Sequence, residues 1–403
     1  MPSARDARAT AAALLSAAAV RERSAIVFAA AERGETRHFR LVPSRFDEVV
    51  RRVADITRRR YPDLEVPCHS RWRHFSAGGI GRAGLVAAGT EIAETARARI
   101  DLAVVSVLLD AGAGSSWQYR EAETGQILGR SEGLAVASLR AMQAGLFSAE
   151  PGDPWRADAA ALALITPDRL SSAFQHGAAN ALVGLEGRSL LLRRCGQICA
   201  ADPVHFGRTA RPGGLYDYWR ASGDRLRAAD ILKTLLVAFG PIWPSGTGLG
   251  GVPLGDCARH SAVPKDGLVP FHKLSQWLAY SLVEPLQAGG IEVVELDGLT
   301  GLAEYRNGGL FLDCGVIEPR DPQLASRPLM PRSEPVVEWR ALTIILLDRL
   351  AIEVRHRLGK SAAAFPLAKV LEGGSWAAGR EIAGERRPDG AAPLVIAADG
   401  TLF

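Results

Sequence analysis

The segment VVEWRALTIILL at 336–347 sets the fold class, because apolar side chains fill consecutive helical turns and only Glu338 and Arg340 add charge. A largely apolar helical run of this kind is typical of a core helix. Similar patterns predict helices at 90–109, 131–147, 185–199, 228–239, 271–287, 336–357 and 376–384, and helices broken near Gly34 within 3–60. Extended patterns are few and short: 37–41, 117–119, 291–296 and 310–312. We therefore predict a mainly α fold with a few short strands.

The length of the chain allows either one large helical domain over residues 1–403 or two lobes. Internal repeats are absent to the eye. The best candidate boundary is the Pro- and Gly-rich segment 148–156, which would give lobes 1–150 and 151–403. We predict a single domain, with these lobes as the alternative.

Composition excludes several classes of protein. Hydrophobic residues make up 47% and charged residues 23%, which is typical of globular rather than disordered chains. Only five of the 48 basic residues are lysines, a bias typical of GC-rich genomes, and the arginines are scattered among 44 acids. We therefore expect no nucleic-acid partner. No window reaches the ~18 apolar residues that span a membrane, so we expect a cytoplasmic protein and leave its oligomeric state open.

Two motifs that suggest cofactors have plainer explanations. Cys195 and Cys199 lie one helical turn apart among five cysteines, but no second pair or nearby histidine completes a zinc site. The glycines of 246–251 have G-x-G-x-x-G spacing, yet Pro244 precedes them and Pro253 follows, where a dinucleotide site needs a strand and then a helix. We predict buried thiols, a turn-forming loop, and no metal or cofactor.

The helix predicted at 271–287 carries an unusual polar face. At 100° per residue, six polar or aromatic side chains fall within roughly 140° of arc: His272, Lys273, Gln276, Trp277, Tyr280 and Glu284. A solvated face would be built from several Lys, Glu and Arg, whereas this mixture suits the wall of a pocket. A half-exposed amphipathic helix remains the alternative.

Two further stretches place carboxylates beside apolar sequence. Glu338 shares a helix face with Leu342 and Ile345, and a buried carboxylate needs a partner or a shifted pKa. Either an ion pair, for which Arg340 is a poorly placed candidate, or a ligand-binding role explains it. The second stretch, 299–313, combines an acid, a phenol, a guanidinium and an amide with a Gly-Gly turn and an apolar strand that ends at Asp313: Glu304, Tyr305, Arg306 and Asn307. Asp313 as a simple turn former before Gly315 is the alternative.

Smaller polar clusters recur elsewhere. Arg71, Arg73 and Arg130 can clamp a phosphate, with Lys273 as a point charge. Asp256 lies near His260, and Glu372 precedes Trp376 and Arg380. None of these clusters is specific alone, but their number favours an enzyme.

Taken together, the polar strings resemble the uracil-catabolism protein family, which comprises the fourth protein of the fungal pathway and its bacterial relatives and has long been classed as a domain of unknown function. The resemblance covers essentially the whole chain and rests on SRWRHF (70–75), LDAGAG (109–114), GRSEG (129–133), LVGLEGR (182–188), VPFHKLSQW (269–277), EYRNGG (304–309), VEWRALT (337–343), LEGGSW (371–376) and DGT (399–401). One departure is Cys257-Ala258 after Asp256, where the family has a bulkier segment, and this weakens a role for that loop.

The resemblance implies a pathway that opens the uracil ring while it is attached to ribose phosphate, and then releases urea. One required step is hydrolysis of the N-glycosidic bond of a ribosylurea 5-phosphate. The helices with Gln276 and with Glu338 and Arg340 also resemble the helical queuosine-phosphate glycosidases, which implies a similar helical fold.

For that reaction we predict Asp313 as the anionic carboxylate and Glu338 as the acid. The other predicted site residues bind substrate: His272 and Gln276 the ureido group, Tyr305, Arg306 and Asn307 the sugar, and Arg71, Arg73, Arg130 and Lys273 the phosphate, with Asp256, Glu304, Arg340 and Glu372 in the same set. A non-catalytic protein that holds a labile intermediate is the alternative. A metal-dependent amidohydrolase is disfavoured because no His-x-His or His-Glu-x-x-His spacing occurs.

Overall fold

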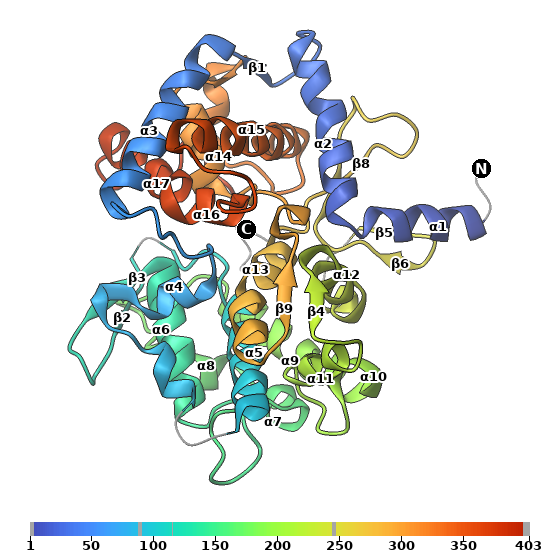
Figure 1. Ribbon diagram of the computed structural model, residues 1–403, viewed down its shortest axis with the longest axis vertical. Helices are drawn as coiled ribbons and strands as arrows, with labels where there is room; N and C mark the ends of the chain where they lie inside the picture. The colour runs from blue at the N-terminus through green and yellow to red at the C-terminus, as the bar shows by residue number, and fades with distance from the viewer. Residues whose placement is uncertain (1–3, 88–90, 115, 244–246, 398–403) are drawn as a thin grey trace. The chain divides into compact units, whose positions relative to one another are not determined.

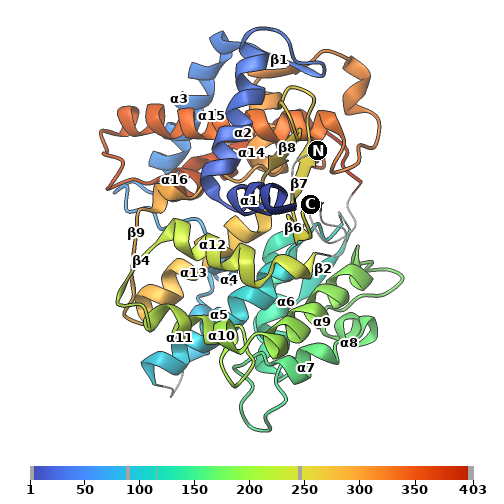
Figure 2. The same cartoon turned by 90° about the vertical axis from the view of Figure 1, so that its right-hand side faces the viewer.

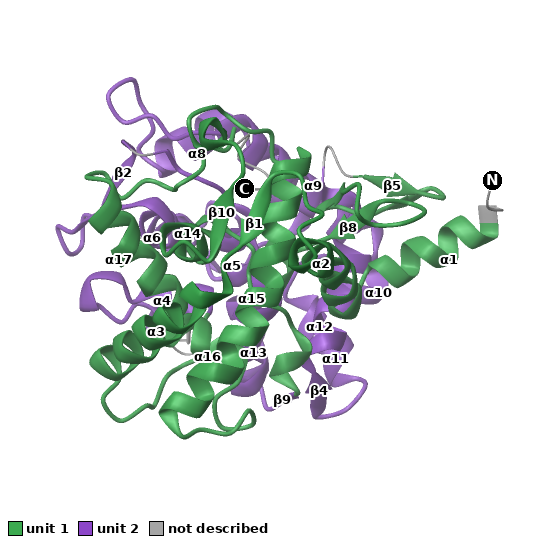
Figure 3. Cartoon of the chain, turned by 90° about the horizontal axis from the view of Figure 1, so that it is seen from above, with its two compact units in different colours: residues 1–69, 246–276, 295–397 green, residues 70–245, 277–294, 398–403 purple. Residues whose placement is uncertain are grey.

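Helices dominate the computed structural model, which describes residues 4–87, 91–114, 116–243 and 247–397 (Figures 1 and 2). The predicted mainly α class is confirmed. Contacts divide the chain into two units, each assembled from segments far apart in sequence (Figure 3). Unit 1 comprises Met1–His69, Gly246–Gln276 and Glu295–Ala397, and unit 2 comprises Ser70–Ser245, Trp277–Val294 and Ala398–Phe403. The boundary suggested at 148–156 lies inside unit 2, so these units do not correspond to lobes 1–150 and 151–403.

Unit 1 contains the N-terminal helices, three small antiparallel strand pairs and the C-terminal helices. Its helices are α1 (Ala4–Leu14), α2 (Ala17–Glu32), α3 (Phe46–Arg60), α14 (Tyr305–Asp313), α15 (Glu334–Leu358), α16 (Leu367–Val370) and α17 (Trp376–Arg386), with a π-helical turn at Leu371–Ser375. Its strands are β1 (Phe39–Leu41) paired with β10 (Ile317–Pro319), β5 (Gly248–Leu249) paired with β6 (Val252–Pro253), and β7 (Cys257–Arg259) paired with β8 (Leu268–Pro270).

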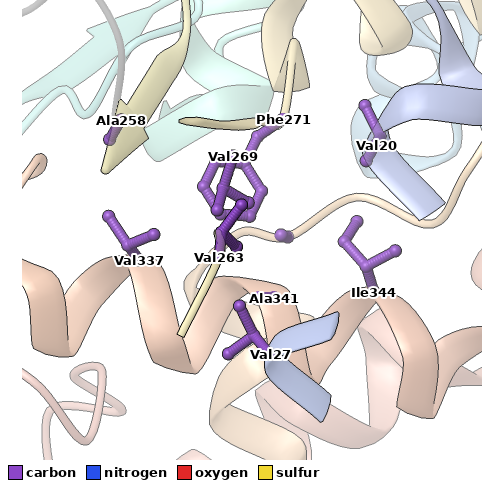
Figure 4. Close-up of a cluster of buried hydrophobic side chains, with 10 residues drawn as sticks. Val20, Val27, Ala258, Val263, Val269, Phe271, Val337, Ala341 and Ile344 are labelled. Atoms are coloured by element: carbon purple, nitrogen blue, oxygen red, sulfur yellow. The ribbon is translucent and has the colours of Figure 1, made fainter. Parts of the chain in front are cut away.

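The core of unit 1 forms around α15, as its apolar sequence predicts. Val337, Ala341 and Ile344 lie four and three residues apart, so they share one face of the helix. Figure 4 shows this face beside residues of α2 and of the β7–β8 pair, among them Val27 and Val269. Helices α2, α3 and α14 all contact α15, and within 336–347 every residue except Ile345 is buried.

The strand predicted at 310–312 is wrong, because these residues belong to helix α14. The Glu304 carboxylate caps the helix by accepting hydrogen bonds from the backbone N–H of Arg306 (2.7 Å) and Asn307 (2.6 Å). Gly308 leaves room for the ring of Trp339, whose indole N–H donates to the Gly308 carbonyl (3.0 Å). A short apolar run after two glycines fits a strand or a helix equally well, and here packing against α15 selects the helix.

The glycine-rich loop is a hairpin turn, as predicted. Its described part pairs β5 with β6, and Gly250 and Gly251 between them have φ of 59° and 79°. Such positive φ angles favour glycine. Gly246, the first glycine of the motif, and the string at 399–401 lie outside the described residues.

Unit 2 is helical around α5 (Ile92–Leu108), which is buried along most of its length. The other helices are α4 (Arg71–Phe75), α6 (Arg130–Gln143), α7 (Ala159–Ala163), α8 (Pro167–Ala173), α9 (Leu185–Ala201), α10 (Pro203–Phe206), α11 (Gly214–Arg220), α12 (Ala228–Ala238) and most of α13 (Lys273–Ala288). Strand β2 (Gln118–Arg120) pairs antiparallel with β3 (Ile127–Gly129), and β4 (Arg225–Arg227) pairs parallel with β9 (Glu292–Val294).

Two features of composition have their counterparts in the structure. All five cysteines are free thiols, and Cys195 and Cys199 are fully buried in α9. Within the described ranges, none of the helices combines the length and apolar character that crossing a bilayer demands.

Candidate functional site

Four strings that are distant in sequence meet in unit 2. Arg71 and His74 come from α4, Asp110 follows α5, Ser131 lies in the first turn of α6, and Trp277 lies in α13. We call these five residues the Asp110 cluster. Helix α4 is fixed against α13 because Ser281 accepts hydrogen bonds from the Arg71 backbone N–H (2.9 Å) and from the Trp72 indole (2.8 Å).

Three donors converge on the Asp110 carboxylate. Ser131 Oγ donates to Oδ1 at 2.5 Å, Arg71 Nη1 lies 2.8 Å from the same oxygen, and Trp277 Nε1 donates to Oδ2 at 3.1 Å. A carboxylate offers about four acceptor positions, so about one position on Oδ2 remains for a ligand or water. The Asp110 side chain is 9% exposed, and Ser131 is half-buried, so the cluster is not completely closed off from solvent.

Arg71 is the buried cation of the cluster. Its Nε donates to Ser106 Oγ (2.7 Å), and Nη1 donates to the carbonyl (3.0 Å) and hydroxyl (2.8 Å) oxygens of Ser131. Nη2 is buried and has no hydrogen-bond partner in the described part of the chain. Burial lowers the pKa of the Arg71 guanidinium, and the charge of Asp110 opposes that shift.

His74 contacts two members of the cluster through one ring nitrogen. Its Nδ1 lies 3.1 Å from Arg71 Nη1 and 3.0 Å from Ser131 Oγ. Because a guanidinium can only donate, a hydrogen bond with Arg71 requires Nδ1 to be the acceptor. The imidazole also lies beside the Trp277 indole, with ring centroids 5.7 Å apart and planes inclined at 46°. The cluster therefore offers aromatic surface next to a charged hydrogen-bonding pair.

Arg188 of α9 holds the segment that carries Asp110. Its guanidinium donates to the carbonyls of Val183 (3.1 Å), Ala111 (2.8 Å) and Gly112 (2.8 Å), and also to that of Leu109. Burial lowers the pKa of Arg188 to about 10, so it stays charged at neutral pH. One side chain thus fixes the backbone on both sides of Asp110, which makes Arg188 a positioning residue.

In unit 1, several residues predicted to bind substrate are used in internal contacts. The Asp256 carboxylate receives both Arg340 Nη1 (2.8 Å) and Nη2 (2.7 Å), and the Lys273 backbone N–H donates to it (3.0 Å). Burial would raise the pKa of Asp256, but Arg340 holds it below its usual value. His272 has φ of 50° and its Nε2 lies 2.9 Å from the Leu14 carbonyl.

The side-chain amide of Gln276 is also occupied. Its oxygen accepts from the Thr300 backbone N–H at 2.9 Å, and its nitrogen donates to Thr300 Oγ1. Gln276 is fully buried. These contacts favour a structural role for Gln276, and the ureido contact predicted for it and His272 stays a prediction.

The cluster around 304–307 stabilises the start of α14. Burial raises the pKa of the Glu304 carboxyl, which serves as the helix cap. The Asn307 amide donates to the Leu302 carbonyl (3.1 Å) and accepts from Ser375 Oγ (2.9 Å). Arg306 donates to the Gly390 carbonyl (2.9 Å), and its guanidinium lies 5.2 Å from the ring centre of Tyr305. Glu304 and Asn307 thus have well-defined structural partners.

The two carboxylates predicted as catalytic have separate partners. Glu338 Oε1 accepts from the backbone N–H of Phe39 (2.7 Å), and Oε2 lies 3.2 Å from His260 Nε2. Asp313 forms a bidentate ion pair with Arg387, at 2.8 and 2.5 Å. Among the described residues no hydrogen bond or ion pair joins His272, Asp313 or Glu338 to one another. Their catalytic roles stay predictions.

The remaining predicted residues divide between the units. Glu372, in the π-helical turn of unit 1, contacts Arg60 Nη2 (3.2 Å), the Tyr61 hydroxyl (3.2 Å) and His69 Nδ1 (2.8 Å). In unit 2, Arg73 pairs with Glu284, whereas Arg130 precedes Ser131 at the start of α6 with φ of 53°. Of the four residues predicted to bind phosphate, Arg71 belongs to the Asp110 cluster, and Arg73 and Arg130 are sequence neighbours of its members His74 and Ser131.

Sequence reasoning missed Asp110, Ser131 and Trp277 as members of one site. Each occurs in a string that carries the family resemblance, but no local spacing connects them. Within the described ranges, no three His, Cys, Asp or Glu side chains gather in a way that could hold a metal ion.

Comparison with known proteins confirms the family resemblance that the sequence strings indicated. The fold and the Asp110 cluster define a mainly α-helical protein with a buried arginine–carboxylate site. The chain belongs to the family described as "Protein of unknown function (DUF1688)", whose model matches residues 13–403. It is 39% identical to "Protein urg3" of Schizosaccharomyces pombe, over 98% of this chain and 99% of that protein. It is 37% identical to "Uracil catabolism protein 4" of Lachancea kluyveri, over 96% of this chain and 98% of that protein.

Proposed function

We propose that this protein acts in uracil catabolism and hydrolyses the N-glycosidic bond of a ribosylurea 5-phosphate. The pathway assignment is supported by near full-length similarity to a protein named for uracil catabolism. The reaction assignment rests on one observation, the Asp110 carboxylate, which is 9% exposed and fixed by three donors beside a buried arginine.

The reaction breaks the bond between ribose C1 and the urea nitrogen. The bonding electrons leave with nitrogen, and the sugar passes through an oxocarbenium-like state. Water supplies the oxygen that binds C1 and loses one proton, while the leaving nitrogen gains one. The products are ribose 5-phosphate and urea. Such a site needs a fixed carboxylate near C1 and a proton donor near the leaving group.

Asp110 meets the first requirement. Ser131, Arg71 and Trp277 hold its carboxylate in one orientation, and the unoccupied position on Oδ2 accepts the proton of the attacking water. We propose Glu132, a half-buried residue that follows Ser131 in the first turn of α6, as the proton donor for the leaving nitrogen, a role that requires its protonated form. In this proposal Asp110 and Glu132 take the roles first predicted for Asp313 and Glu338.

The experiment measures urea release from ribosylurea 5-phosphate by the purified full-length protein. Asp110→Asn keeps the size of the side chain but removes its charge, and we expect kcat to fall by roughly 10²- to 10⁴-fold. The matched control is Asp217→Asn, a 53% exposed carboxylate of α11 in the same unit, which should leave kcat unchanged. Thermal unfolding of both variants confirms that they are folded.

The outcomes separate the alternatives. If the wild-type protein binds the compound but releases no urea above background, the hydrolase proposal is overturned and an intermediate-binding protein is favoured. If wild-type protein is active and Asp110→Asn is equally active, Asp110 is not the carboxylate. Loss of activity in Asp313→Asn or Glu338→Gln, without loss of stability, would then return the role to the residue affected.

A further inference from the structure

We propose that Arg71 recognises the carbonyl oxygen of the planar ureido group through its Nη2 nitrogen, and so sets the specificity of the site for ureides. This inference deepens the proposed function and rests on it for the identity of the substrate. It starts from an inventory of the Arg71 hydrogen bonds.

Arg71 uses only part of its donor capacity within the protein. A guanidinium has five N–H bonds and no acceptor. Nε donates to Ser106 Oγ, which in turn accepts from Ser138 Oγ at 2.6 Å, and Nη1 serves Ser131, His74 and Asp110. Both N–H bonds of Nη2 have no partner in the described part of the chain, although Arg71 is 0% exposed. Unpaired buried donors are rare and unfavourable, so this one points to an acceptor supplied by a ligand.

The surroundings of Nη2 determine what that acceptor is. The neighbouring nitrogen of the same guanidinium lies 2.8 Å from Asp110, so an anionic group bound at Nη2 would be repelled by the carboxylate. A neutral carbonyl oxygen avoids that repulsion. Trp277 and His74, whose ring centroids are 5.7 Å apart, add flat aromatic surface to the same cluster. A neutral, planar group with a carbonyl oxygen, such as an amide or a ureide, fits this combination.

The contact would also assist bond cleavage. As the C1–N bond breaks, negative charge develops on the leaving nitrogen and is delocalised onto the adjacent carbonyl oxygen. A cationic donor at that oxygen stabilises the transition state more than the ground state. Arg71 would therefore affect kcat as well as binding, and it would reject leaving groups that lack a strong acceptor at this position.

The test compares ribosylurea 5-phosphate with its thiourea analogue, in which sulfur, a weak acceptor, replaces the carbonyl oxygen. We expect wild-type protein to prefer the oxygen compound by at least about tenfold in kcat/KM. Arg71→Lys keeps one charge to pair with Asp110 but has no second nitrogen, so the preference should fall towards unity. Arg225→Lys, at a 69% exposed arginine of β4, is the matched control and should keep the wild-type preference.

Further measurements keep the inference falsifiable if Arg71→Lys does not fold or if neither compound is hydrolysed. Ser106→Ala removes the acceptor of Nε and should reduce the preference partially. Dissociation constants from calorimetry replace kcat/KM when there is no turnover, because recognition by Arg71 does not require hydrolysis. Equal handling of both compounds by wild-type protein would overturn the inference. So would a crystal structure of the complex in which an ordered water, rather than the ureido oxygen, occupies Nη2.

Discussion

Replacement of Arg188 by lysine tests whether one side chain fixes the segment that carries Asp110. The guanidinium donates to four backbone carbonyls, two of which belong to Ala111 and Gly112. A lysine amine keeps the charge but cannot spread its donors over four divergent oxygens. Hydrogen bonds to charged groups contribute ~1.5–3 kcal/mol each, so the loss of two predicts a destabilisation of roughly 3–6 kcal/mol.

The assay is unfolding by guanidinium chloride, with the free energy of unfolding extrapolated to water. Arg225→Lys is the control, because this exposed arginine makes only a 3.5 Å ion pair with Glu292 and should change stability by less than about 0.5 kcal/mol. We also expect urea release by folded Arg188→Lys to fall, since Asp110 loses its support. A destabilisation below about 1 kcal/mol, set against the ~1.5–3 kcal/mol expected for each lost bond, would refute this reasoning.

Two further predictions concern unit 2. Burial would raise the pKa of Glu121, but hydrogen bonds from Arg82 and other donors outweigh burial and lower the pKa from 4.5 to about 2. Glu121→Gln should therefore lower the free energy of unfolding by about 3–5 kcal/mol at neutral pH. Because the pKa of Glu121 is lower in the folded protein, this stabilisation is complete above pH 4.5 and is lost towards pH 2. The free energies of unfolding of wild type and variant should therefore converge in acid. A difference in stability that does not change with pH would contradict the lowered pKa. Gly133→Ala should destabilise the protein by about 1–3 kcal/mol, because a Cβ at this position overlaps the Leu128 carbonyl. Gly84→Ala is the control: its Cβ meets no atom within 4 Å, so the same unfolding assay should show no change in stability.

Much of the fold could be predicted from the sequence because hydrophobic periodicity is a local signal. The run 336–347 predicts a core helix, and α15 is that helix. The prediction failed at α14, where residues 310–312 follow two glycines. Three residues are too few to distinguish the two-residue period of a strand from the 3.6-residue period of a helix. Glu304 is an uncommon helix cap, so the local sequence did not mark the start of this helix.

Less of the candidate site could be predicted. Arg71 was identified as a ligand-binding residue from its type and neighbours, and the structure places it in the Asp110 cluster. The sequence marked Asp110 only as part of the string LDAGAG (109–114), because its partners Ser131 and Trp277 are 21 and 167 residues away. Asp313 and Glu338 were predicted as catalytic because a carboxylate beside apolar sequence needs a partner. In the structure the partner of Asp313 is Arg387, and the partners of Glu338 are the Phe39 backbone N–H and His260.

The sequence by itself determined the helical class of this protein, its family, and which polar strings deserve interest. Only the tertiary structure decided which of those polar groups face one another. The physical reason is the range of the forces: apolar periodicity is set within a few turns of one helix, whereas a hydrogen bond forms only when donor and acceptor approach within about 3 Å in the right direction. For Arg71 and Asp110, that placement depends on how α4, α5, α6 and α13 pack in unit 2.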